Sequence, residues 1–257
     1  MDVLAFSLPV EPSTLAVLVS GALIGGVISG ALGFGSGPAV IGIWLLVLPP
    51  QVAAPLLTFN ALFFVSASIR QVWHAVDIGR LTPLVIGSLL GTPLGVTVLL
   101  LIPGDALKLA IGTLLIGYAA IMLTVGRALV IQKTTVLIET LVGLAGGAIG
   151  GAAAMPGVIW AFWCGIRGWS KDVQRAVYQP LNLMTVAFAV ISFAVAGLVT
   201  RDVLWLALLT LPASLGGVAL GMPLYARIDT GLFRRVVLVA LGLIGVSIVV
   251  GRLLEAS

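Results

Sequence analysis

Two breaks containing glycine and proline interrupt apolar stretches of this chain, and their chemistry suits the binding of an anion. The first reads Gly-Ala-Leu-Gly-Phe-Gly-Ser-Gly-Pro over residues 30–38, and the second reads Gly-Gly-Ala-Ala-Ala-Met-Pro over residues 150–156. Because glycine lets the backbone turn and proline suits the first turn of a helix, each break predicts a new helix N-terminus. A helix N-terminus presents unpaired N–H groups and about half a positive charge, and it therefore attracts anions.

The predicted anion site is built on these two helix starts. In the first half, the Ser36 hydroxyl and nearby backbone amides would donate hydrogen bonds to the anion. In the second half Met155 stands where Gly37 does, so the backbone would act with less help from side chains. The alternative is that these groups only satisfy the loops. The site residues predicted at the two breaks are Gly35, Ser36, Gly37, Pro38, Ala39, Met155, Pro156 and Gly157.

Polar residues inside the neighbouring apolar spans are further candidates. Intramembrane polar residues usually face the bundle interior, although asparagine and threonine also form hydrogen bonds between helices, and both alternatives stay open here. Arg175 could neutralise the second charge of a doubly ionised anion, or it could be an ordinary basic residue at the cytoplasmic edge. Glu139 could carry a coupling proton or could mark the start of its helix. The polar candidates for substrate binding are Thr58, Asn60, Arg175, Tyr178, Gln179 and Asn182.

The composition is that of a membrane protein. Hydrophobic residues make up 60% of the chain and charged residues 9%, against about 25% charged residues in a soluble domain. The single cysteine, Cys164, excludes an internal disulfide and a multi-cysteine metal site, and no metal or cofactor is expected. The 13 basic residues sit singly or in short clusters between apolar spans, which favours a role in membrane topology over nucleic-acid binding.

The chain contains an internal duplication. Gly87-x-x-x-Gly91-x-Pro-Leu recurs as Gly217-x-x-x-Gly221-x-Pro-Leu, the two breaks correspond, and Asn60 corresponds to Asn182. The predicted fold is an all-α polytopic membrane protein with two inverted repeats, each a broken-helix hairpin plus three transmembrane helices. Its predicted segments are an extracytoplasmic tail at 1–12, a first repeat at 13–126, a cytoplasmic linker at 127–135 and a second repeat at 136–252.

The distribution of basic residues favours a hairpin at each break. With hairpins, residues 70–80, 127–133, 167–175 and 227–235 fall on one side of the membrane and hold ten of the 13 basic residues. If each break lay within a single crossing, the basic residues would split six and seven, which the positive-inside rule does not favour. Both termini are therefore predicted outside the cytoplasm, and the two short helices would point their N-termini at one midplane site.

The two breaks, the duplicated halves and the Gly-x-x-x-Gly-x-Pro runs resemble the TauE/SafE sulfite exporter-like permeases, also called the toluenesulfonate uptake family. The resemblance implies a bacterial inner-membrane carrier that moves small sulfur oxyanions, such as sulfite, sulfoacetate or related organosulfonates, outward. We expect alternating access around the midplane site, with a proton or sodium as possible coupling ion. A passive anion channel is the alternative, because facing helix ends would serve conduction equally well.

No enzyme is predicted. The serine-hydrolase elbow Gly-x-Ser-x-Gly is absent, because Phe34 and Pro38 occupy the flanking glycine positions around Ser36. The remaining glycines predict close helix packing, as in the series Gly87/Gly91/Gly95 and Gly143/Gly147/Gly151. The residues predicted near span ends, as an aromatic belt, are Trp44, Trp73, Trp163, Trp169 and Trp205.

Overall fold

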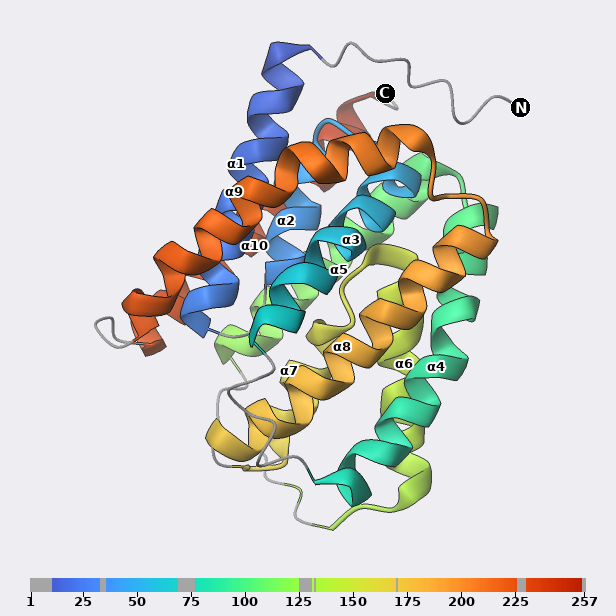
Figure 1. Cartoon of the computed structure of the whole chain (residues 1–257), viewed down its shortest axis with the longest axis vertical. Coiled ribbons are helices and arrows are strands. Elements are labelled where there is room, and N and C mark those ends of the chain that lie inside the picture. Colours follow the sequence, from blue (N-terminus) through green and yellow to red (C-terminus); the bar gives the residue numbers. More distant parts are fainter. Residues whose placement is uncertain are drawn as a thin grey trace.

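The structure is a computed structural model, and it describes residues 11–32, 36–68, 77–124, 131, 133–169, 171–225 and 230–255. Within these ranges every regular element is an α-helix, as predicted (Figure 1). The helices are α1 (Pro12–Leu32), α2 (Ser36–Trp44), α3 (Pro50–Ser68), α4 (Ile78–Leu101), α5 (Gly104–Thr124), α6 (Val136–Ala153), α7 (Gly157–Ile166), α8 (Lys171–Val195), α9 (Arg201–Tyr225) and α10 (Thr230–Glu255).

The helix lengths divide the bundle into long spans and two short pieces. In the described residues, seven helices are long and apolar enough to cross a membrane, which confirms the expectation of a multi-pass protein. The helices that follow the breaks are short, with nine residues in α2 and ten in α7. At about 1.5 Å per residue each covers roughly half the hydrocarbon core. The first of these short helices begins at Ser36 and ends at Trp44, and a turn then leads to Pro50.

Glycines let helices from opposite halves of the chain pack with their backbones in contact. A Cβ atom on Gly91 of α4 would collide with the Leu144 carbonyl of α6, and one on Gly147 would collide with the Ser88 carbonyl of α4. The α1–α9 pair is built in the same way, because Gly26 faces the Ser214 carbonyl and Gly217 faces the Leu23 carbonyl. The predicted packing role of these glycines is confirmed, and the Cα–H groups lie close to carbonyl oxygens across both interfaces.

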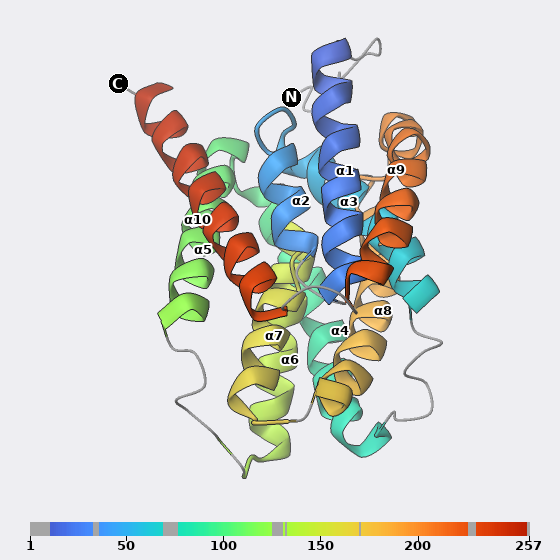
Figure 2. The same ribbon diagram turned by 90° about the vertical axis from the view of Figure 1, so that its left-hand side faces the viewer.

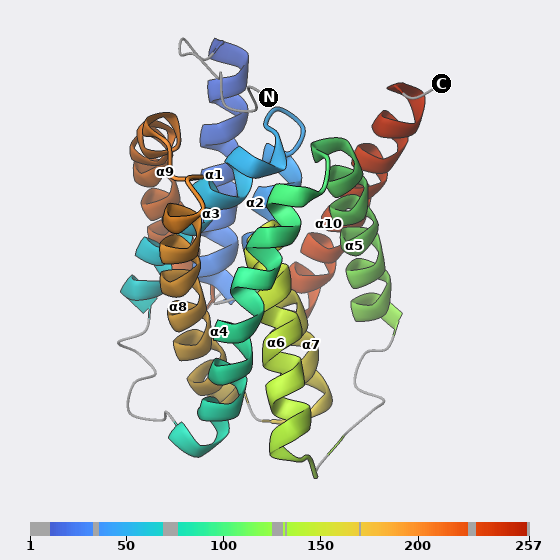
Figure 3. The ribbon, with the colours of Figure 1, turned by 90° about the vertical axis from the view of Figure 1, so that its right-hand side faces the viewer.

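The two hairpins lie at opposite ends of the molecule. Figures 2 and 3 show the α1–α2 pair in the upper part of the bundle and the α6–α7 pair in the lower part, with α5 beside α10. The start of α1 and the end of α10 lie at the same upper end (Figure 1). An ion pair of 2.8 Å between Arg252 of α10 and Asp105 of α5 joins two helix ends there. The C-terminal ends of α1 and α6 therefore both lie near the middle of the bundle (Figure 2).

Two of the tryptophans predicted for an aromatic belt are buried instead. Trp44 is 0% exposed and Trp163 is 6% exposed. The Nε1 atom of Trp44 donates a hydrogen bond of 3.0 Å to the Leu18 carbonyl, where Gly21 leaves room for the indole ring. The belt prediction is wrong for these two residues because spacing along the chain locates a helix end but not the side of the helix that neighbouring helices cover. Trp205, in contrast, is exposed, and Trp73 lies outside the described residues.

Candidate functional site

The two predicted breaks come together in the fold. A Cβ atom on Gly37, in the first turn of α2, would lie 3.1 Å from the Ala154 carbonyl oxygen and 3.7 Å from the Cα of Met155. Ala154 ends α6 in the left-handed conformation, with φ of 53°, which turns the chain back toward α7. A Cβ atom would make this contact tight, so glycine suits the close approach of the two backbones. The starts of α2 and α7 thus share one interior region.

The start of α7 has backbone donors that no side chain caps. Pro156 occupies the N-cap position and makes no side-chain cap hydrogen bond. The Val158 amide bonds to the Met155 carbonyl at 3.2 Å, as part of the turn itself. The Tyr178 hydroxyl of α8 lies directly beside Gly157, in the space that a side chain there would fill. The helix start is therefore flanked by a phenolic hydroxyl.

Gln179 is the most unusual polar residue of this region. Its side chain is 2% exposed, and neither Oε1 nor Nε2 has a hydrogen-bond partner among the described residues. Buried polar groups in folded proteins almost always have partners, so an unpaired carboxamide indicates a group reserved for a ligand or water. A second buried glutamine, Gln51, behaves in the ordinary way and donates to the Leu99 carbonyl at 3.3 Å.

Gln179 lies close to the start of α7 because it directly follows Tyr178, whose hydroxyl lies beside Gly157. Asn182 lies one turn further along α8 and is half-buried. Leu183, one turn after Gln179, packs with Val65 of α3 and Val218 of α9, so this side of α8 faces those two helices.

Asn60 and Thr58 use their polar atoms within the protein. Asn60 Nδ2 donates to the Leu56 carbonyl at 3.1 Å and to Thr210 Oγ1 at 2.9 Å, and its Oδ1 accepts from Ser214 at 3.0 Å. Thr58 donates to the Ala54 carbonyl at 2.8 Å. Of the two alternatives for Asn60, the structure contains the hydrogen bond between helices.

A second polar contact between helices was not predicted. Ser88 of α4 and Thr185 of α8 share a short hydrogen bond, and Thr185 also donates to the Leu181 carbonyl. Thr185 follows Pro180 by five residues, just as Asn60 follows Pro55 in α3. Thr185 thus joins α8 to α4 by a polar contact, as Asn60 joins α3 to α9. The spacing of five residues from a helix-internal proline was the sequence signal that could have indicated Thr185. The match between two asparagines drew attention to Asn182 instead.

Some of the remaining predicted site residues lie outside the part of the chain that the structure describes, and others are buried at the breaks. Gly35 lies outside the described residues, and so does the side chain of Arg175, whose backbone lies in α8. The buried members of the predicted set at the breaks are Ser36, Pro38, Ala39, Met155 and Pro156.

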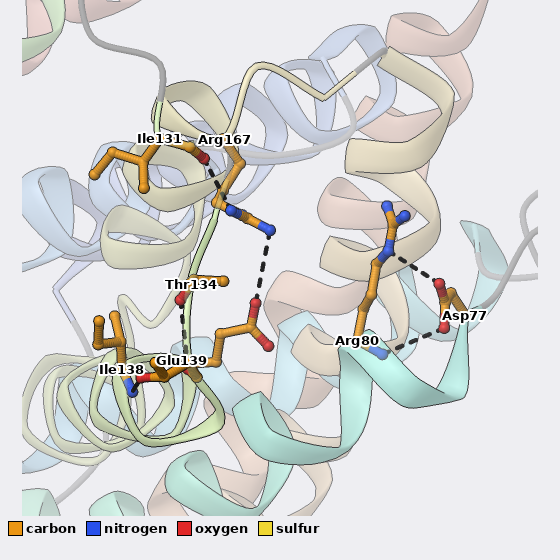
Figure 4. A network of polar contacts seen from close by, with 8 residues as sticks. Asp77, Arg80, Ile131, Thr134, Ile138, Glu139 and Arg167 are labelled. Atoms are coloured by element: carbon orange, nitrogen blue, oxygen red, sulfur yellow. Dashed lines mark hydrogen bonds and ion pairs between the residues drawn. The ribbon is translucent and has the colours of Figure 1, made fainter.

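A charged network lies at the lower end of the molecule, away from the breaks (Figure 4). Glu139 stands in the first turn of α6, which Thr135 caps by accepting from the Ile138 amide at 3.3 Å. Its carboxylate lies 3.9 Å from the Arg167 guanidinium, which also donates to the Ile131 carbonyl at 2.8 Å. Nearby, Arg80 pairs with Asp77 at 3.0 Å. Glu139 therefore has the helix-start position expected of its structural alternative.

The described residues contain no group of three or more histidine, cysteine, aspartate or glutamate side chains that could hold a metal ion. A multi-pass helical bundle in which two interrupted helices begin again in the interior is the architecture typical of membrane transporters. The profile of the sulfite exporter TauE/SafE family matches residues 17–248, and the chain belongs to that family. It is thus a membrane transporter of sulfur anions and not an enzyme. No curated protein and no solved structure matches the chain significantly.

Proposed function

We propose that the protein is a secondary carrier that exports sulfite or a small organosulfonate by alternating access around the region where the two breaks meet. The observation that carries the proposal is the approach of Gly37 to Ala154, which brings two helix starts to one place. Two N-termini facing one ligand supply N–H donors and partial positive charge without a buried cation. Such sites at broken helices are typical of transporters with repeated halves.

The proposal includes two inverted repeats, residues 13–126 and 136–252, joined by the linker 127–135. The packing pairs support it. If α1 to α5 correspond in order to α6 to α10, then the α4–α6 pair is the counterpart of the α9–α1 pair, and both are glycine-packed. The positions of the two hairpins at opposite ends of the bundle fit the same correspondence between the halves (Figure 2). Relative movement of the halves would then open the site to each side in turn.

The donors near the breaks suit a sulfonate or sulfite group. Such a group carries three oxygens that accept hydrogen bonds, and the carboxamide of Gln179, the Tyr178 hydroxyl and the backbone of Gly157 are neutral groups near one helix start. Ser36 would contribute from the other start. Arg175 would supply the positive charge that a doubly ionised anion needs, and a proton or sodium gradient would drive export.

The sharpest test compares two buried glutamines. In Gln179→Leu, we expect the apparent KM for sulfite uptake into proteoliposomes to rise about tenfold or more, since a hydrogen bond to a charged ligand contributes roughly 1.5–3 kcal/mol. The melting temperature should stay equal or rise, because two unpaired polar atoms disappear. In the control Gln51→Leu, the lost bond to Leu99 should lower the melting temperature and leave KM unchanged. Equal KM values in both variants would refute the site.

Two further measurements test the mechanism and the topology. Saturable counterflow of sulfite is expected of a carrier, and its absence together with much faster flux would indicate a channel. Both ends of the chain are proposed to lie outside the cytoplasm. Protease added to intact cells should therefore remove tags at either terminus, and protection of both tags would overturn the topology.

A further inference from the structure

Two buried indole groups on α7 have no hydrogen-bond acceptor. Trp160 is 1% exposed and Trp163 is 6% exposed, and the Nε1 atom of each lacks a partner among the described residues. Buried polar groups are normally satisfied, so two unpaired donors within one turn of a ten-residue helix call for an explanation. Both groups can only donate, which restricts any ligand to an acceptor.

Trp160 lies directly beside the region where the breaks meet. Its ring packs edge-on against Tyr178, with ring centres 6.1 Å apart and an angle of 79°. The Tyr178 hydroxyl in turn lies beside Gly157 at the start of α7. The indole Nε1 of Trp160 sits against Gly146 of α6, where a side chain would not fit. Trp160 thus stands one helical turn after the start of α7, and its donor lies against α6 below the proposed anion site.

Trp163 continues the same side of α7 toward the basic lower end of the molecule. Gly157, Trp160, Trp163 and Arg167 recur at nearly helical spacing. The guanidinium carbon of Arg167 lies 5.9 Å from the ring centre of Trp163. Arg167 is one of the two arginines labelled in Figure 4. The donors thus form a series from the helix start to a cationic end, inside a cluster that Leu81, Leu84, Val177 and Leu181 enclose.

The short helix of the first half shows that an unpaired indole is not a general feature of this fold. Trp44, near the end of α2, is buried as completely, yet its Nε1 donates to the Leu18 carbonyl at 3.0 Å. On α7 the indole N–H groups of Trp160 and Trp163 have no partner among the described residues, whereas on α2 that of Trp44 is used in packing. A packing role alone would explain the rings of Trp160 and Trp163 but not their unpaired nitrogens.

We propose that the indole N–H groups of Trp160 and Trp163 form a second anion station on α7, between the meeting point of the breaks and the end of the bundle that carries Arg80 and Arg167. The ligand is a small oxyanion with several acceptor oxygens, such as sulfite. It passes from the helix start to these donors when the surrounding apolar cluster opens. The station rests on the proposed function, because it serves the same anion on its way across the membrane.

The test removes the donors without changing the shape of the rings. Trp160 and Trp163 are each replaced by 3-benzothienylalanine, in which sulfur stands in place of the indole N–H. We expect the maximal rate of sulfite transport in proteoliposomes to fall about tenfold or more, since each replacement removes a hydrogen bond to a charged ligand. The melting temperature should not fall, since no protein hydrogen bond is lost. The same replacement at Trp44 is the control, with a lower melting temperature and an unchanged rate.

A second measurement uses the unmodified protein. In protein labelled with ¹⁵N-tryptophan, sulfite should shift the indole N–H resonances of Trp160 and Trp163 and leave that of Trp44 in place. If the wild-type protein transports sulfite but neither the rates of the variants nor these resonances change, the second station is refuted and the proposed function stands. If the wild-type protein transports neither sulfite nor an organosulfonate, the proposed function itself fails and the station fails with it.

Discussion

Ser214 of α9 donates a hydrogen bond of 3.0 Å to the Oδ1 atom of Asn60 in α3. The Asn60 carboxamide also donates to Thr210 of α9, so one side chain of the first half holds a helix of the second half at two points. Inside a membrane such contacts stabilise helix pairs by about 0.6 kcal/mol on average, and by up to about 1.7 kcal/mol. These hydrogen bonds give the Asn60 side chain a structural role.

Replacing Asn60 by leucine tests this role. The variant keeps the side-chain volume but loses both hydrogen bonds to α9, and we expect a loss of about 1–2 kcal/mol of stability with little change in the KM for sulfite. Ser214→Ala should cost less, and the double variant should cost less than the sum of the single effects. Unfolding curves in detergent and proteoliposome flux provide the two readouts. A KM increase of tenfold in Asn60→Leu would return this residue to the binding site.

Gly37→Val tests the meeting of the breaks. Even a methyl group on Gly37 would lie 3.1 Å from the Ala154 carbonyl, and the larger side chain of valine would push the two helix starts apart. Overpacking of this kind costs about 1–3 kcal/mol, and the anion donors would no longer converge. We therefore expect sulfite flux to fall at least about tenfold in protein that still assembles. Normal flux in a folded Gly37→Val protein would contradict a shared site.

Two adjacent glycines of α9 form a matched pair for the helix interface. A Cβ on Gly217 would collide with the Leu23 carbonyl of α1, whereas a Cβ on Gly216 would meet nothing within 4 Å. Gly217→Ala should destabilise the protein by about 1–3 kcal/mol. Gly216→Ala should stabilise it by about 0.5–1 kcal/mol, since alanine favours the helix. Thermal unfolding of the two variants, side by side, checks the difference, and equal melting temperatures would show that the α1–α9 backbones are not in contact.

Glu139→Gln separates a structural carboxylate from a proton carrier. Glu139 pairs with Arg167 at 3.9 Å and stands in the first turn of a capped helix, so we expect a stability loss of about 1–3 kcal/mol. The pH dependence of sulfite flux should remain that of the wild-type protein. Flux measured across a range of pH values in matched proteoliposomes decides between the roles. A variant that transports at a rate independent of pH would identify Glu139 as the coupling residue.

Several properties could be predicted because they depend on residues that are neighbours in the chain. The length of an apolar run determines whether a helix can cross a bilayer, and seven helices of the described residues are long and apolar enough to do so. The breaks at the glycine- and proline-rich stretches were equally local features, since backbone freedom at glycine and the fixed φ of proline act within one turn. The glycine spacing likewise indicated which helix faces could pack closely.

The state of individual polar atoms depends on contacts between distant segments. The sequence left open whether Asn60 binds substrate or joins helices, and α9 supplies it with Thr210 and Ser214, 150 and 154 residues further along the chain. Trp44 and Trp160 lie on the two short helices. The indole N–H of Trp44 donates to a backbone carbonyl, whereas that of Trp160 has no partner among the described residues. No pattern within a single segment distinguishes these cases.

The sequence by itself therefore determined the membrane class, the order of the helices, the two breaks and the family to which the chain belongs. Only the tertiary structure decided that Gly37 approaches Ala154, that Gln179 has no partner within the described part of the chain and that Asn60 bonds to α9. The physical reason is that helix formation and bilayer crossing follow from local propensity and length, whereas the pairing of a buried polar atom depends on which partner the packing of remote helices places beside it.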